Sequence, residues 1–150
     1  MKKIIYFIEF LLIEFLFIIC KVIGYKSASD LGYFIGKNFG NFFRKKKSII
    51  ENLLKSKIAI NIPENQFVNN ILGNYGRILA EYPFLKDFRT NKLDKFISID
   101  GIENLDKIKI NNKPVVFISG HFNNFELMAM QIEKHGINLA AIYRPLNNVF

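Results

Sequence analysis

The first 25 residues are dominated by one long apolar stretch. Residues 4–23 are almost continuously apolar and are interrupted only by Glu9, Glu14 and Lys21. This length matches the ~20 residues that an α-helix needs to cross ~30 Å of hydrocarbon. The two glutamates lie about 140° apart around a helix, so they share no polar stripe, and each is unfavourable at the bilayer centre. We predict a membrane-anchor helix over residues 1–25, either transmembrane or monotopic.

Two other interpretations of this stretch stay open. A cleaved signal peptide would begin with Lys2 and Lys3 and end at the small residues Ser27, Ala28 and Ser29. A buried core helix is the third interpretation.

More basic residues follow the apolar stretch than precede it. The following ones are Lys21, Lys26, Lys37 and the run Arg44, Lys45, Lys46 and Lys47. The positive-inside rule then predicts that the rest of the chain lies in the cytoplasm. The run at 44–47 either contacts anionic lipid or is the solvated start of a helix.

Helical periodicity continues over residues 26–90. Apolar residues recur at helical spacing in 27–43, in 45–59 and in 63–82, where Pro63 suits a first helical position. The apolar positions are Leu31, Phe34, Ile35, Phe39 and Phe42 in the first segment and Phe67, Ile71, Tyr75, Ile78 and Leu79 in the third. We predict a helical segment here.

The period changes from residue 96 onward. Residues 96–101, 114–120 and 137–145 are typical of strands, and residues 102–109 and 123–136 of helices, the second closed by Gly136. Strand, helix and strand in this order predict a parallel sheet with a right-handed crossover. The predicted fold class is therefore α/β, with residues 91–150 as the first part of a larger sheet domain. Because a parallel sheet needs cover on both faces, we expect the chain to be a fragment or a truncated product.

Composition and charge narrow the function. Half of the chain is apolar, which is enough for a core, and the single cysteine, Cys20, excludes a disulfide framework and a thiolate zinc site. With only two histidines, we predict no metal and no cofactor. The net charge is +8, but residues 1–47 hold nine basic and three acidic side chains. This excess of positive charge surrounds the predicted anchor, and no motif that reads RNA or DNA is present. We therefore do not expect nucleic-acid binding.

One segment carries candidate chemistry. His121 and Glu126 follow the predicted strand 114–120, and functional groups collect at the carboxyl ends of parallel strands. If His121 lies in the turn and Glu126 in the first helical turn, the carboxylate orients an imidazole that accepts a proton from a hydroxyl. The alternative is a capping box, in which Asn123 caps the helix and Glu126 does nothing more. His135, beside Gly136, is interpreted as a partner of the helix C-terminus.

These residues carry a resemblance. The block S-G-H-F-N-N-F-E-L at 119–127, followed by A-I-Y-R-P-L-N-N at 141–148, resembles the bacterial lipid A biosynthesis acyltransferases, the lauroyl and myristoyl transferases of lipopolysaccharide assembly. Their pattern is similar to H-x-G-N-W-E-L and then Y-R-P-L-x-N-P. Upstream, residues 44–53 and 99–105 resemble further family motifs in the expected order. Two departures are Asn123 at the usual Gly and Phe125 at the usual Trp. Asn best replaces Gly at a left-handed position.

The resemblance implies a membrane-bound transferase on the cytoplasmic side of the bacterial inner membrane. It moves a fatty acyl group from acyl carrier protein to a hydroxyl of a lipid A precursor. It assigns His121 as general base, Glu126 as its partner, and Arg144 and Asn124 as substrate contacts. The family is about twice as long as this chain, so an active enzyme and a chain that is inactive on its own both stay open. The rival functions are another glycerolipid or glycolipid acyltransferase and an inactive membrane-tethered remnant.

Overall fold

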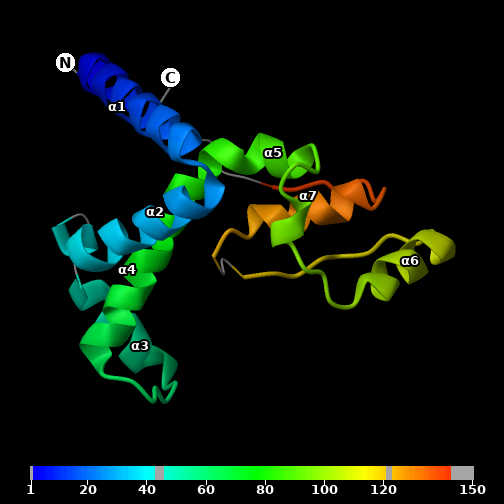
Figure 1. Cartoon of the computed structure of the whole chain (residues 1–150). Helices are drawn as coiled ribbons and strands as arrows, with labels where there is room; N and C mark the ends of the chain where they lie inside the picture. Colours follow the sequence, from blue (N-terminus) through cyan, green and yellow to red (C-terminus); the bar gives the residue numbers. More distant parts are fainter. Residues whose placement is uncertain (1, 43–45, 121–122, 143–150) are drawn as a thin grey trace. The chain divides into compact units, whose positions relative to one another are not determined.

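Helices are the only regular secondary structure in the part of the chain that the structure describes. The computed structural model describes residues 2–42, 46–120 and 123–142, and no strand occurs in these ranges (Figure 1). The elements are α1 (Lys2–Ile23), α2 (Tyr25–Phe39), the 3₁₀ turn η1 (Gly40–Phe42), α3 (Lys46–Ser56), α4 (Glu64–Glu81), η2 (Tyr82–Phe84), α5 (Leu85–Arg89), η3 (Asp94–Phe96), α6 (Ile102–Asn111) and α7 (Glu126–Lys134). They form two compact units, Ile13–Pro83 and Met1–Leu12 with Phe84–Phe150. We call the first the hairpin unit and the second the α7 unit.

The predicted N-terminal helix is present as α1, but the prediction of a transmembrane anchor is wrong. Among the described residues, no helix is both long enough and apolar enough to cross a bilayer. Any 18-residue stretch of α1 contains Glu9, Glu14 and at least one lysine. These charges interrupt the apolar run that a spanning helix requires.

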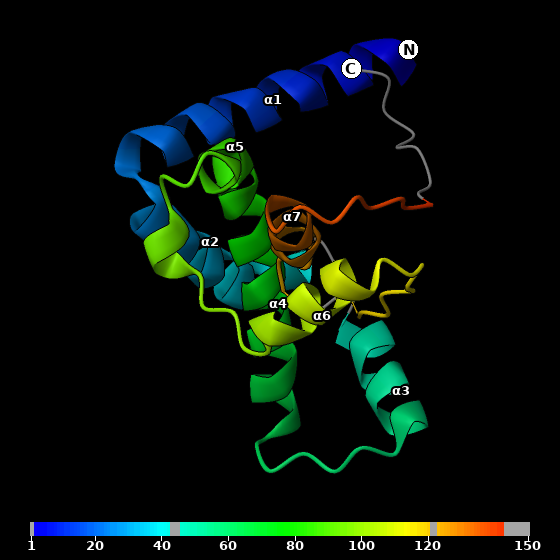
Figure 2. The same cartoon turned by 90° about the vertical axis from the view of Figure 1, so that its right-hand side faces the viewer.

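The hairpin unit is built on close contact between α2 and α4, which lie side by side in both views (Figures 1 and 2). Glycines make this contact possible. A Cβ added at Gly32 would lie 2.5 Å from the Gly76 carbonyl oxygen, and one added at Gly36 would overlap the Leu72 carbonyl oxygen. The two backbones are therefore closer than any larger residue at these positions permits.

The buried face of α2 is consequently not the face predicted from its large apolar residues. α2 buries the small residues Ala28, Ser29, Gly32 and Gly36. Phe34, Ile35 and Phe39 are 58%, 45% and 50% exposed. On α4 the buried positions include Val68, Leu72, Gly73 and Ala80, one position away from several of the predicted apolar residues.

α3 closes one end of the hairpin unit. Ile49 of α3 packs in a buried cluster with Val68 and Leu72 of α4, and Ile50 and Ile71 flank the cluster. α3 thus contacts α4 through Ile49, which is its one buried side chain. Leu72 belongs both to this cluster and to the contact between α2 and α4.

A buried carboxylate links α4 to α2 at the other end of the hairpin unit. Glu81 of α4 is 6% exposed, and its Oε1 accepts hydrogen bonds from Ser29 Oγ at 2.7 Å and from the Tyr25 hydroxyl at 3.4 Å. Burial, together with the charge of Glu81 and the hydrogen bond to it, raises the pKa of Tyr25 to about 12. Because a buried charge needs partners, this network fixes the register of α2 on α4.

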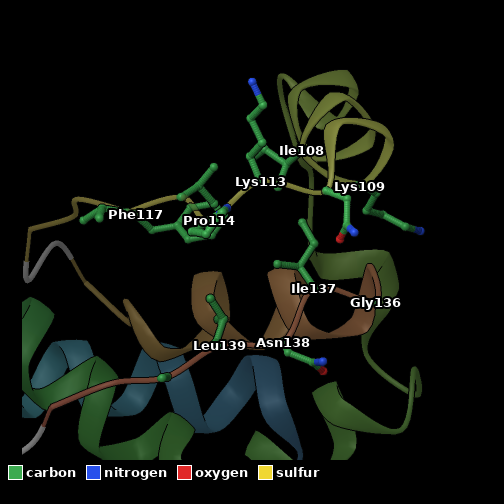
Figure 3. A pocket seen from close by; sticks show the side chains of 13 residues that line it. Ile108, Lys109, Lys113, Pro114, Phe117, Gly136, Ile137, Asn138 and Leu139 are labelled. Carbon is green, nitrogen blue, oxygen red and sulfur yellow. The ribbon is translucent and has the colours of Figure 1, made fainter.

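The predicted α/β fold is wrong for the described residues of the α7 unit. Residues 97–99, 113–120 and 137–142 have no regular secondary structure and form no sheet. Segments 113–117 and 136–140 instead line a cavity of about 800 Å³ together with the end of α6 (Figure 3). Val116 and Ile118 are 87% and 93% exposed. Parallel strands are stable when both faces are covered, and these segments lack that cover in the described structure.

Candidate active site at the start of helix α7

The turn before α7 has the backbone that its sequence predicts. Asn123 has φ 47°, in the left-handed region that favours Gly and, among other residues, Asn. The Phe125 N–H donates to the Asn123 carbonyl at 3.1 Å, and the Leu127 N–H donates to the Asn124 carbonyl at 3.2 Å. The chain therefore bends over residues 123–125 and enters α7 at Glu126.

Glu126 is the first residue of α7. Its side chain is partly buried, and its Oε2 atom is shielded from solvent. The positive end of the helix dipole favours a carboxylate at this position. The Oδ1 atom of Asn124, two residues earlier, is also shielded from solvent. The turn thus holds two predicted site residues, Asn124 and Glu126, close together in a partly buried setting.

The capping-box alternative does not form as the sequence suggested. The N-cap of α7 is Phe125, and no side chain makes a capping hydrogen bond there. Asn123 lies two residues before the N-cap, and its left-handed backbone is outside the conformation of a residue that caps a helix start. Glu126 therefore does not act as the third residue after an Asn123 cap.

The rest of α7 is fixed by ion pairs within its own unit. Lys134 Nζ donates to the Phe88 carbonyl at 3.1 Å and to Asp94 Oδ1 at 2.8 Å. Arg89 of α5 bonds to Glu133 at 3.2 Å. These contacts at the far end of α7 hold the helix that presents Glu126.

The C-terminus of α7 confirms the predicted helix end. The helix stops at Lys134, His135 is its C-cap, and Gly136 has φ 81°. His135 Nε2 lies 3.6 Å from Asp106 Oδ1 of α6. The position agrees with the interpretation of His135 as a residue of the helix terminus.

An apolar cavity of about 530 Å³ adjoins the first turns of α7. Leu127, Met128, Gln131 and Ile132 of α7 form one wall. The segment 96–101, Leu105 and Phe117 form the remainder. Leu127 directly follows Glu126 in the sequence, and Glu126 itself does not line the cavity. Its size is within the range of small-molecule sites.

His121 and Arg144, the predicted base and substrate contact, lie outside the described residues.

The cavity at 96–132 and the anchoring of α7 by Lys134 were not expected from the sequence. The sequence did offer a signal for the cavity, because apolar and polar residues alternate from Ile97 to Asp100 and Phe117 lies in an apolar run. Nothing local in the sequence joins these segments to α7. Among the described residues, no three His, Cys, Asp or Glu side chains gather as metal ligands would.

Comparison with known proteins places the chain in a family. The family model described as bacterial lipid A biosynthesis acyltransferase matches residues 1–150. No curated protein and no solved structure matches the chain. The chain therefore belongs to the bacterial lipid A biosynthesis acyltransferase family, as the motifs at 119–127 and 141–148 predicted, and its class is that of an acyltransferase of lipid A biosynthesis.

Proposed function

We propose that the chain transfers a fatty acyl group from an acyl carrier protein to a hydroxyl of a lipid A precursor. The observation that carries this proposal is the family match over the whole chain, which includes His121 and Glu126 at the spacing of the family motif. The position of Glu126, at the first residue of a firmly anchored helix, supports it.

In the proposed reaction, His121 accepts the proton of the acceptor hydroxyl as its oxygen attacks the thioester carbonyl carbon. The carbon–sulfur bond then breaks, the acyl group remains on the acceptor oxygen, and the proton leaves with the carrier thiol. Glu126 stabilises the imidazolium that forms between these steps. The positive end of the helix dipole lies at the same position and favours a carboxylate there.

We assign substrate contacts to Asn124 and Arg144. Asn124 lies in the turn that begins α7, two residues before Glu126, so it is near the proposed reaction centre. Arg144 belongs to the family motif Y-R-P, and a guanidinium suits a phosphate of the precursor or of the carrier arm. The apolar cavity beside Leu127 and Met128 is the proposed place for the transferred chain.

The donor and the location are also proposals. Acyl carrier proteins are acidic, and the net charge of +8 favours their encounter with this chain. The acceptor is a membrane lipid, so we place the reaction at the cytoplasmic face of the bacterial inner membrane. Exposed basic residues such as Lys26 and Lys47 suit an anionic surface there.

The test is acyl transfer in vitro with the chain, radiolabelled dodecanoyl carrier protein and a lipid A precursor. His121→Ala should lower kcat by ~10²–10⁴-fold. Glu126→Gln, which keeps the size of the side chain but removes its charge, should also lower kcat with little change in the melting temperature. Transfer from the carrier protein should slow as salt is raised, through an increase in KM.

Glu133→Gln is the matched control, because it is the same substitution on the same helix, on the anchored end of α7. It should leave kcat unchanged. If the folded parent chain transfers no acyl group, or if His121→Ala transfers at the parent rate, the proposed activity of this chain is wrong. Normal turnover by Glu126→Gln would remove Glu126 from the mechanism.

A further inference from the structure

A cavity of about 800 Å³ lies between two segments of the α7 unit that have strand-like sequences. Residues 113–117 form one wall and residues 136–140 form the other, together with the end of α6 (Figure 3). Neither Asn124 nor Glu126 lines this cavity. It is therefore distinct from the candidate active site, and the proposed function gives it no role.

Both walls of the cavity present backbone groups that have no backbone partner. Residues 113–118 and 138–142 form no backbone–backbone hydrogen bond with any other described residue. The side chains of Val116, Ile118 and Ile142 are also largely exposed. A row of unpaired N–H and C=O groups is a template on which an extended polypeptide can pair, as in the addition of a strand to a sheet edge.

The size of the cavity matches one extended stretch of polypeptide. A residue in a strand occupies roughly 160 Å³, given a rise of ~3.3 Å, a distance of ~4.8 Å between strands and ~10 Å between packed layers. About five such residues fill the cavity, and each wall is also five residues long. A helix satisfies its own backbone groups, so it would leave those of both walls unpaired. The geometry therefore favours an extended occupant that pairs with both walls.

Two lysines place positive charge at one end of the cavity. Lys109 and Lys113 line it, and no acidic residue does so in the part of the chain that the structure describes. The Lys109 ammonium lies 3.7 Å from the position that a Cβ on Gly136 would take, so it stands where the second wall begins. Lys113 begins the first wall, and both walls run from this end toward Phe117 and Leu139 (Figure 3). Acidic residues at one end of the occupant complement these charges.

We propose that the cavity between residues 113–117 and 136–140 binds an extended segment of another polypeptide, whose backbone pairs with both walls. The segment is rich in β-branched residues, which suit an extended backbone beside the valines of the first wall. Its acidic residues lie at the end that meets Lys109 and Lys113. The proposal goes beyond acyl transfer and does not depend on it.

The test is fluorescence anisotropy of labelled peptides titrated with the whole chain, which a fusion partner keeps soluble. The glutamate peptide has five alternating valine and threonine residues with one glutamate on each side, so that either direction of binding is covered. It should bind saturably to the chain and not to the fusion partner alone. A version with three central residues should bind roughly 10-fold more weakly, because it forms fewer backbone hydrogen bonds. A version with N-methylated backbone should not bind, because methylation removes the donors.

Amide hydrogen exchange locates the bound peptide on the chain. Binding of the glutamate peptide should slow exchange at residues 115–117 and 137–140, because their N–H groups become hydrogen-bonded. Exchange in α3, which belongs to the hairpin unit, should not change.

Proline substitutions in the first wall test the backbone pairing. Successive N–H groups of a strand point to opposite sides, so at least one of Val115→Pro and Val116→Pro removes a donor to the peptide. That variant should weaken binding about 5-fold, which corresponds to ~1 kcal/mol for one hydrogen bond. Ile142→Pro is the matched control, because Ile142 is exposed and does not line the cavity, and it should bind as the parent does.

Glutamine substitutions test the charge at the end of the cavity. Lys109→Gln and Lys113→Gln should each weaken the glutamate peptide about 2- to 5-fold at low salt, and less at high salt. Neither should affect a peptide that carries glutamine in place of glutamate. Lys107→Gln is the matched control, since Lys107 is an exposed lysine of α6 outside the lining, and it should change neither affinity. Far-ultraviolet circular dichroism verifies that each variant keeps its helices.

Several results would overturn the proposal. They are the absence of saturable binding by the folded chain, undiminished binding of the N-methylated peptide, and parent-like binding by both Val115→Pro and Val116→Pro. If no peptide binds and the chain instead forms a dimer that these proline variants dissociate, a second copy occupies the cavity and the proposal is wrong. The acyl-transfer assay plays no part in these results, so the proposed function stands or falls separately.

Discussion

Replacement of Gly76 by alanine tests the close contact between α2 and α4. A Cβ at Gly76 would overlap the Gly32 carbonyl oxygen and would lie 3.0 Å from both the N and the Cα atoms of Gly36. All three obstacles are backbone atoms in a helix, so no side chain can rotate away. The two helices must therefore separate by a substantial fraction of an ångström for Gly76→Ala to fold.

The expected loss follows from two opposing terms. Overpacking costs ~1–3 kcal/mol, and a clash with backbone belongs at the upper end of that range. Alanine returns about 1 kcal/mol of helix propensity relative to glycine. The net loss in the free energy of unfolding should be ~2 kcal/mol. In a chain of 150 residues, that loss lowers the melting temperature by ~4–8 °C.

Gly73→Ala is the matched control, three residues away on the same helix. A Cβ there would lie 2.6 Å from the Tyr33 ring, which is a side chain that can move. The gain in helix propensity should nearly cancel the smaller clash, so the free energy of unfolding should change by less than ~1 kcal/mol. Denaturation in urea, followed by circular dichroism at 222 nm and by amide hydrogen exchange in α2 and α4, measures both variants. A Gly76→Ala protein as stable as the parent, or an equal loss in Gly73→Ala, would refute the backbone-contact argument.

Three other predictions concern polar contacts. Ser29→Ala removes a donor to the buried carboxylate of Glu81 and should lower the free energy of unfolding in urea by ~1–3 kcal/mol. Tyr25 should ionise near pH 12 in an absorbance titration at 295 nm. Because its folded pKa is raised above the usual value near 10, its contribution to stability should be complete below pH ~10 and be lost as the pH rises through 12. Lys134→Met should speed amide hydrogen exchange in α7, because the Lys134 side chain is mostly buried and bonds to two partners. Arg89→Met breaks an exposed ion pair and should change the free energy measured by this exchange by ~1 kcal/mol or less.

The helices could be located from the sequence because their signals are local. Periodicity over 27–43, 45–59 and 63–82 corresponds to α2 with η1, α3 and α4, and residues 102–109 to α6. At Asn123 and Gly136 the residue type predicted a left-handed backbone or a helix end, and both occur. The family was likewise predictable, because its motifs consist of short runs of neighbouring residues.

The candidate site was only partly predictable. The sequence named Asn124 and Glu126, and the structure places them together in the turn that begins α7. The capping role offered for Asn123 was not realised, since whether Asn reverses the chain or caps the helix depends on where the first helical hydrogen bond forms. The bonds of Lys134 to Phe88 and Asp94 join positions 40 to 46 residues apart. No sequence pattern within α7 predicts contacts with residues so far away along the chain.

The sequence by itself indicated the approximate positions of α1 to α4, α6 and α7, and the family to which the chain belongs. The residues that it names for acyl transfer stay a prediction. The tertiary structure alone decided which helix faces are buried and whether extended segments pair. In α2 the face that carries the glycines is buried, whereas Phe34 and Phe39 stay exposed. The reason is that two helix backbones come close only when the second helix has glycines at matching positions along its length. Residues 113–120 and 137–142 have strand-like sequences, yet in the described structure they stay unpaired. Pairing needs a neighbouring strand and cover on both faces, and neither is encoded within the segment itself.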